Sequence, residues 1–181
     1  MRTIGTFFGR QKLNKLALNL PLKQKVSKES SNKNKVGVLC EINEEAEYKN
    51  IIKMISYIRQ DSWSDVNVLA FHNSKNDPDY LQSMLSFDFF LPRDLNWIQE
   101  SKKNVCINFI NMEFDLLIDL TNGNLLPIEL INVKTKAIKK INFFKSKQIK
   151  PLQFLSTHTL ESMVSLIDET FNLSLKSKEI N

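Results

Sequence analysis

The chain has 181 residues, of which 42% are hydrophobic and 25% are charged, and its net charge is +5. This length predicts one domain, and the composition is that of a globular protein with enough apolar residues for a core. The sequence contains no run of about 18 apolar residues, and its start lacks the long apolar segment of a secretory signal. We therefore expect a cytoplasmic protein with no membrane span.

The charge is distributed unevenly along the chain. Residues 1–35 contain nine bases and one acid, a net charge of +8, whereas the remainder has a net charge of −3. A mildly acidic body thus follows a strongly basic N-terminal arm, which is typical of a protein that binds a polyanion. The bases of the arm are Arg2, Arg10, Lys12, Lys15, Lys23, Lys25, Lys28, Lys33 and Lys35.

Within this arm, Leu13, Leu16, Ala17 and Leu20 keep helical spacing up to Pro21, which would end a helix. The stretch that follows is polar and rich in lysine, so it is expected to be a linker. The sequence accordingly divides into a basic N-terminal arm and linker at 1–35 and an α/β domain at 36–181. The arm is expected to be dispensable for folding, because the periodic apolar elements of the body begin after it.

The body alternates apolar runs with segments of helical spacing. Short apolar runs predict strands at 36–40, 66–71, 87–91, 114–120 and 137–144. Helical spacing predicts helices at 43–59, 125–133 and 159–173, together with a helical turn at 94–101 and an extended segment at 152–155. The segment 105–110 fits either a strand or a short helix, and we favour a helix because one is needed before the strand at 114–120.

The stretch from Phe114 to Leu120 is the centre of this pattern, because its near-continuous apolar run is typical of a strand buried on both faces. Asn122-Gly123 then provides a turn, and the helix and strand that follow complete a βαβ unit. Asp115 and Asp119 are four residues apart, on one face of the strand, where a cation site is the alternative. We expect instead that one of them accepts backbone or Asn N–H groups where the strand enters and leaves the core. The predicted fold is a three-layer, Rossmann-like α/β domain with an open parallel sheet.

The motifs disfavour a phosphate-binding loop and a metal site, and they place both cysteines in the core. The turn after the first strand, at 41–45, has three glutamates and no glycine, so a phosphate-binding loop is not expected. Neither of the two histidines has a second ligand at zinc spacing, and no metal site or cofactor is predicted. Cys40 and Cys106 lie in apolar segments and are expected to be reduced core thiols.

A catalytic site has one candidate set. Cys40, His72 and Asp119 each fall at the carboxyl end of a predicted strand, where a nucleophile, a base and an orienting acid could meet. No nucleophile motif surrounds the cysteine, and polar residues are common at strand ends. We therefore favour a protein that is not an enzyme.

The arm offers the clearest functional hypothesis. Arginine and lysine interleaved with Phe7 and Phe8 suit phosphate neutralisation combined with base stacking on RNA. A solvated tail, an organelle presequence and a membrane-surface segment are the alternatives. The predicted RNA-binding residues are Arg2, Phe7, Phe8, Arg10, Lys12, Lys15, Lys23, Lys25 and Lys28.

The central segment resembles the sugar-nucleotide half of heptosyltransferase-type glycosyltransferases. In that family, a strand with the pattern aromatic-Asp-Leu-hydrophobic-Ile-Asp-Leu precedes a helix and a basic strand. The matching segments here are the strand at 114–120, the helix at 125–133 and the strand at 136–143. Residues 36–173 also resemble a family of small uncharacterised bacterial α/β proteins. The resemblance implies the fold, but the chain has one α/β unit where the enzymes have two, and it lacks their glycine-rich turns.

The leading functional prediction is thus a non-catalytic, RNA-associated protein that docks on RNA or the ribosome through its basic arm. The alternatives are a degenerate sugar-nucleotide-binding domain that acts as a scaffold, and an adaptor at a membrane surface.

Overall fold

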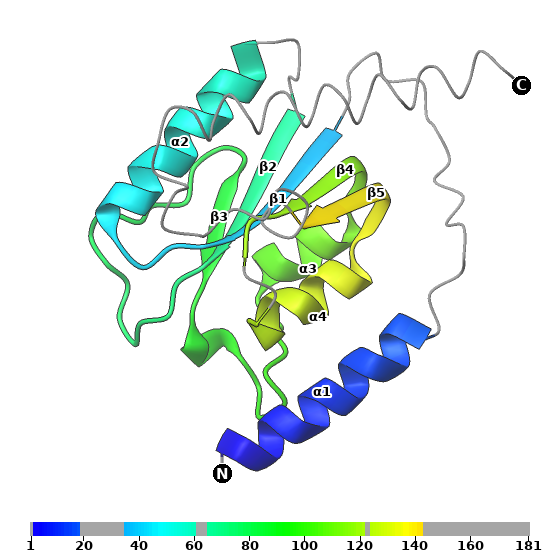
Figure 1. The fold of residues 1–181 in the computed structure, drawn as a ribbon. Helices are drawn as coiled ribbons and strands as arrows, with labels where there is room; N and C mark the ends of the chain where they lie inside the picture. Colours follow the sequence, from blue (N-terminus) through cyan, green and yellow to red (C-terminus); the bar gives the residue numbers. More distant parts are fainter. Residues whose placement is uncertain (1, 19–34, 61–64, 122–123, 143–181) are drawn as a thin grey trace, which may run out of the picture.

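The computed structural model describes residues 2–18, 35–60, 65–121 and 124–142 (Figure 1). Its centre is a five-stranded parallel sheet with the strand order β3-β2-β1-β4-β5. This is the Rossmann-like open α/β sheet that the sequence predicts. The strands are β1 (Lys35–Glu41), β2 (Asp65–Phe71), β3 (Phe87–Phe90), β4 (Glu113–Asp119) and β5 (Lys136–Asn142).

Helices cover both faces of the sheet and produce the three layers (Figure 1). Helix α2 (Glu45–Gln60) lies on one face, where Ile51 and Met54 belong to the same buried cluster as the alternate side chains of the strands. Helices α3 (Asn104–Asn111) and α4 (Leu126–Lys134) lie on the other face, in a second buried cluster. The apolar runs are continuous in the sequence because the central strands bury both faces.

Strand β4 is an interior strand buried on both faces, as predicted, and pairs with β1 on one side and β5 on the other. Leu117 of β4 is fully buried opposite Gly37 of β1. A side chain at Gly37 would bring its Cβ within 2.9 Å of Leu117 Cδ1 and 3.1 Å of the Phe114 ring. Close packing between neighbouring strands therefore favours glycine here, because a Cβ would force the buried side chains of Leu117 and Phe114 to shift.

Both acids of β4 accept hydrogen bonds of the kind that the sequence predicts for one of them. Asp115 Oδ2 accepts the backbone N–H of Lys35 at 2.9 Å where the strand enters the core. At the other end, Asp119 is buried, and its Oδ1 accepts hydrogen bonds from the backbone N–H and the hydroxyl of Thr121. Its Oδ2 accepts a hydrogen bond from Asn132 at 3.2 Å, which ties the end of β4 to α4.

The predicted helical turn at 94–101 is wrong for most of its length. A single 3₁₀ turn, η1 (Pro92–Asp94), is followed by a loop that a bridge between Leu95 and Ser101 closes. The side chain of Asn96 causes this change, because its Oδ1 accepts the N–H groups of Ile98 and Glu100 that a helix would pair with backbone carbonyls. We call residues 95–101 the 95–101 loop.

Helix α1 (Arg2–Leu18) lies along the outer side of α4 (Figure 1). Its Leu13 is buried in a small cluster with Leu126 and Leu130 of α4. The helix begins well before Leu13, the first residue of the helical spacing in the sequence, and this packing on the body was not expected. The predicted linker up to residue 34 and the predicted elements at 152–155 and 159–173 lie outside the described residues, and the division of the chain at residue 35 stays a prediction.

Candidate functional site

Helix α1 approaches the 95–101 loop through two glycines one turn apart. A side chain at Gly9 would place its Cβ 2.5 Å from the carbonyl oxygen of Ile98, and one at Gly5 would clash with the carbonyl of Trp97. Each glycine in a helix interior costs about 1 kcal/mol relative to alanine. The close approach of helix and loop explains why the sequence keeps glycine at both positions.

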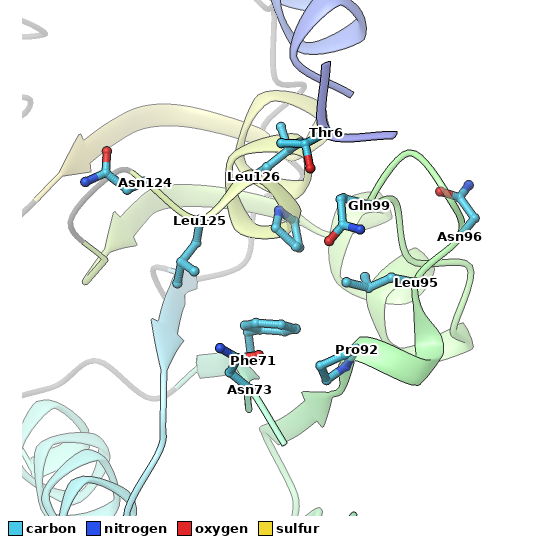
Figure 2. A pocket seen from close by; sticks show the side chains of 11 residues that line it. Thr6, Phe71, Asn73, Pro92, Leu95, Asn96, Gln99, Asn124, Leu125 and Leu126 are labelled. Atoms are coloured by element: carbon cyan, nitrogen blue, oxygen red, sulfur yellow. The ribbon is translucent and has the colours of Figure 1, made fainter. Parts of the chain in front are cut away.

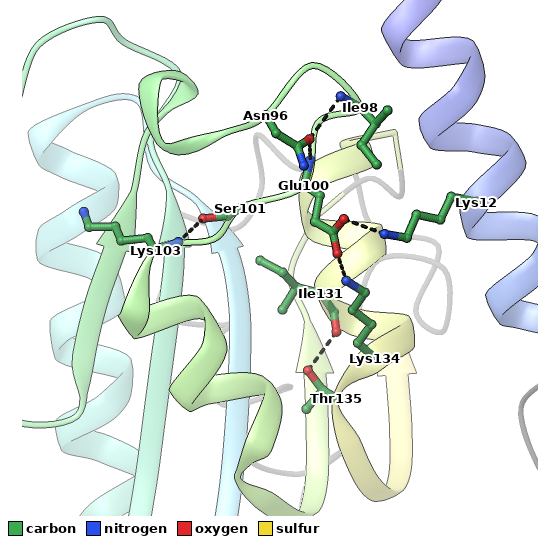
Figure 3. Close-up of polar contacts among 9 residues, drawn as sticks. All are labelled: Lys12, Asn96, Ile98, Glu100, Ser101, Lys103, Ile131, Lys134 and Thr135. Carbon is green, nitrogen blue, oxygen red and sulfur yellow. Dashed lines mark hydrogen bonds and ion pairs between the residues drawn. The ribbon is translucent and has the colours of Figure 1, made fainter.

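Ion pairs hold α1 against the same loop and also against α4 (Figure 3). Glu100 of the 95–101 loop pairs with Lys12 of α1 at 2.6 Å and also with Lys134 at the end of α4. Arg10 of α1 pairs with Glu129 of α4. Burial and the neighbouring Lys12 lower the pKa of Lys134. Helix α1 is thereby held against both the loop and α4.

An apolar surface remains where α1 meets the loop. The ring of Phe8 lies 5.7 Å from that of Trp97 and 5.8 Å from that of Phe7, in edge-to-face geometry in both pairs. The exposed fractions of these side chains are 59% for Phe7, 46% for Phe8 and 67% for Trp97, and Ile4 on the same helix is 63% exposed. We call Ile4, Phe7, Phe8 and Trp97 the aromatic patch. Large apolar side chains that are exposed next to one another are typical of an interaction surface.

The predicted RNA-binding residues divide into three groups. Phe7, Phe8 and Lys15 are exposed on α1, which also contains Arg2. Arg10 and Lys12 are instead partly buried in ion pairs with acids of the body. The remaining three, Lys23, Lys25 and Lys28, lie outside the described residues.

Sequence reasoning did not identify Trp97 as part of this surface. The available signal was the spacing of Gly5 and Gly9, which predicts a helix face that contacts another backbone closely. That signal does not specify which backbone the helix contacts, so it could not have led to Trp97 by itself.

A pocket of about 340 Å³ lies at the carboxyl edge of the sheet, beside α1 (Figure 2). Open parallel sheets usually bind ligands at this edge. The walls come from the end of β2 and the loop after it, from η1 and the 95–101 loop, from the start of α4 and from one residue of α1. They include Thr6, Phe71, Asn73, Pro92, Leu95, Asn96, Gln99 and residues 124–127.

Gln99 has an unusual backbone conformation at this pocket. Its φ of 67° lies in the left-handed region, which non-glycine residues seldom adopt. The side chain points into the space between Leu95, Leu125 and Phe71 (Figure 2). The turn that begins at Asn96 therefore directs an amide group into the cavity.

The three candidate catalytic residues are not assembled into a site. Cys40 is buried in the cluster beneath α2, whereas Asp119 bonds to Asn132 of α4 on the opposite face. His72 is buried, and its Nδ1 lies 2.6 Å from the carbonyl oxygen of Ile42. Burial raises the pKa of the Cys40 thiol far above its usual value, and nearby acids raise it further. Cys40 thus lacks the properties of an activated nucleophile.

Both cysteines are free and buried, as predicted. Burial raises the pKa of Cys106 to about 11. In the described parts of the chain, no three His, Cys, Asp or Glu side chains are grouped closely enough to hold a metal ion. A search of the same residues finds no helix that is long and apolar enough to cross a membrane.

Comparison with protein families gives one match. The model of a family of unknown function, DUF6913, matches residues 6–173, which include most of α1, the sheet and its helices. Comparison with curated proteins and with solved structures gives no match. The similarity to heptosyltransferases thus stays an interpretation of the sequence. Because the matched region covers most of the sequence, the chain belongs to the family of unknown function DUF6913.

Proposed function

We propose that this protein is a non-catalytic, RNA-associated protein that docks on ribosomal RNA through helix α1 and the basic residues that follow it. The observation that supports this proposal best is the aromatic patch on a basic helix. Phe7, Phe8 and Trp97 are each about half exposed or more, although large aromatic side chains are usually buried. Exposed rings beside positive charges provide stacking surfaces for unpaired bases next to phosphate contacts.

The charge distribution supports the same proposal. The positive charge is concentrated in residues 1–35, while the rest of the chain is net acidic. A polyanion is therefore attracted to the N-terminal part of the chain, and the net acidic remainder disfavours contact elsewhere. Lys15 is exposed on the helix that carries Phe7 and Phe8.

The ion pairs of α1 give the surface a defined shape. Arg10 and Lys12 are paired with acids of the body, so they hold the helix in place and contribute less to phosphate binding than exposed bases do. Trp97 comes from a different element and adds to the two phenylalanines of α1. A preorganised surface loses less conformational entropy on binding than a tail that folds on its partner.

The test is a titration of the full chain against purified ribosomal subunits and against anionic phospholipid vesicles, each over a series of salt concentrations. If about five bases contact phosphates, the logarithm of the binding constant should fall with the logarithm of salt with a slope of roughly −3 to −4. Replacing both Phe7 and Phe8 with alanine should weaken subunit binding by about 1–3 kcal/mol per stacked base and leave the slope unchanged.

Leu85→Ala is the matched control, because Leu85 is 91% exposed but lies in the loop before β3. This variant should bind subunits as the wild type does. If the phenylalanine variant binds subunits with wild-type affinity, the RNA proposal is wrong. If vesicles bind and subunits do not, the protein is a membrane-surface adaptor instead.

A further inference from the structure

The pocket at the carboxyl edge of the sheet has the composition of a ligand site, and it is separate from the aromatic patch. We propose that it binds a free nucleoside, with the nucleobase held between apolar walls and recognised by Gln99. The inference does not depend on the RNA proposal, because it concerns different side chains.

The apolar walls favour a flat ring. Phe71 lies on one side of the cavity, and Leu95 and Leu125 border the space into which Gln99 points (Figure 2). Leu126 and Pro127 at the start of α4 add further apolar surface. A volume of about 340 Å³ is at the lower end of the range for small-molecule sites, which fits a nucleoside better than a larger cofactor.

The polar groups of the pocket are uncharged. Its side chains include four carboxamides, those of Asn73, Asn96, Gln99 and Asn124, and no lysine, arginine, aspartate or glutamate. A carboxamide offers a donor and an acceptor side by side, and this pair matches the edge of a nucleobase. The absence of a cation among the lining residues disfavours a ligand that must place a phosphate inside the pocket.

The conformation of the 95–101 loop supports recognition by Gln99. The side chain of Asn96 is used to shape the turn, because its Oδ1 accepts two backbone N–H groups. The side chain of Gln99 makes no hydrogen bond with any described residue, although the turn directs it into the cavity at a strained φ of 67°. Strain of this kind is often found at functional positions.

The experiment is isothermal titration of the full chain with adenosine, guanosine, cytidine and uridine. At least one nucleoside should give saturable binding, and its 5′-triphosphate should bind no more tightly. Gln99→Gly removes the amide and suits the left-handed backbone, so the turn is retained while binding should weaken about tenfold. Ser86→Gly is the matched control, because Ser86 is the other described non-glycine residue with positive φ and does not line the pocket.

The outcomes separate this inference from the RNA proposal. Replacing both Phe7 and Phe8 with alanine should leave nucleoside affinity unchanged, and Gln99→Gly should leave the salt dependence of subunit binding unchanged. The inference is overturned if none of the four nucleosides gives saturable binding at millimolar concentration. It is equally overturned if Gln99→Gly binds the nucleoside as tightly as Ser86→Gly does.

Discussion

Gly9 of α1 lies directly against the backbone of Ile98, so that a Cβ at this position would lie 2.5 Å from the Ile98 carbonyl oxygen and 2.7 Å from Leu126 Cδ2. One position of the helix thus contacts both the 95–101 loop and α4. The contact places Phe8 beside Trp97 and Thr6 at the pocket. The docking of α1 therefore contributes to both proposed surfaces.

Gly9→Ala should release α1 from the body. Alanine favours the helix by about 1 kcal/mol, but the clash with backbone cannot be relieved by a side-chain rotation, and overpacking of this kind costs about 1–3 kcal/mol. Hydrogen exchange should show faster exchange of the α1 amides with little change in β1 and β4. Asn14→Ala on the exposed face of α1 should leave the exchange rates of the α1 amides unchanged. If the α1 amides were equally protected in the Gly9→Ala and Asn14→Ala variants, the described docking would be contradicted.

Glu100→Gln should weaken the same docking by a different route. The carboxylate is mostly buried between Lys12 and Lys134, and its loss leaves two positive groups facing an uncharged amide. We expect a loss of about 1–3 kcal/mol in the free energy of unfolding, between the values for exposed and for buried pairs. Urea unfolding at low and at high salt measures this loss, which should be smaller at high salt.

The control for this variant is Glu45→Gln, which removes an exposed pair between Glu45 and Lys49 on α2. Pairs of this kind contribute about 0.2–0.5 kcal/mol. Equal losses in the two variants would mean that the Glu100 pairs are as solvated as those of a surface helix.

Leu117→Ala should destabilise the protein by about 2–5 kcal/mol, because it removes a fully buried side chain of the central strand and leaves a cavity. Ile138→Ala on the edge strand β5 is the control, since Ile138 is 52% exposed. Urea unfolding should show a much smaller loss for this variant. A loss below about 1 kcal/mol for Leu117→Ala would be inconsistent with a central position for β4.

The two buried thiols should make the protein less stable at alkaline pH. The pKa of Cys106 is raised to about 11 and that of Cys40 further, so both remain protonated in the folded state while the unfolded chain releases these protons near pH 9. The folded state then binds more protons, and the free energy of unfolding falls as pH rises above about 9.

Urea unfolding between pH 8 and pH 10 tests this dependence. In the variant with both cysteines replaced by alanine, the free energy of unfolding should fall less between pH 8 and pH 10 than in the wild type, whatever its value at pH 8. In the native wild type at pH 8, neither thiol should react with a disulfide reagent until urea unfolds the chain. Rapid reaction of the native protein would show that the thiols are accessible.

The sequence by itself determined the fold class and, in the described part of the body, the strands and helices other than the segment at 94–101. Strands such as 36–40 and 114–120 could be predicted because a strand buried on both faces is a continuous apolar run. The sequence also indicated that one of Asp115 and Asp119 accepts N–H groups, because they lie at the two ends of such a run; the structure shows that both do. Phe7, Phe8 and Lys15 could be identified as candidates because their charge and aromatic character do not depend on distant residues.

Only the tertiary structure decided where α1 packs and which segments it contacts. Gly5 and Gly9 are unfavourable in an isolated helix, and their role appears only when the backbone of Trp97 and Ile98 lies against them. The pocket and the patch likewise combine α1 with segments about 60 to 120 residues further along the chain. Local patterns record which faces are buried, whereas the partners of those faces depend on how the packed layers bring distant segments together.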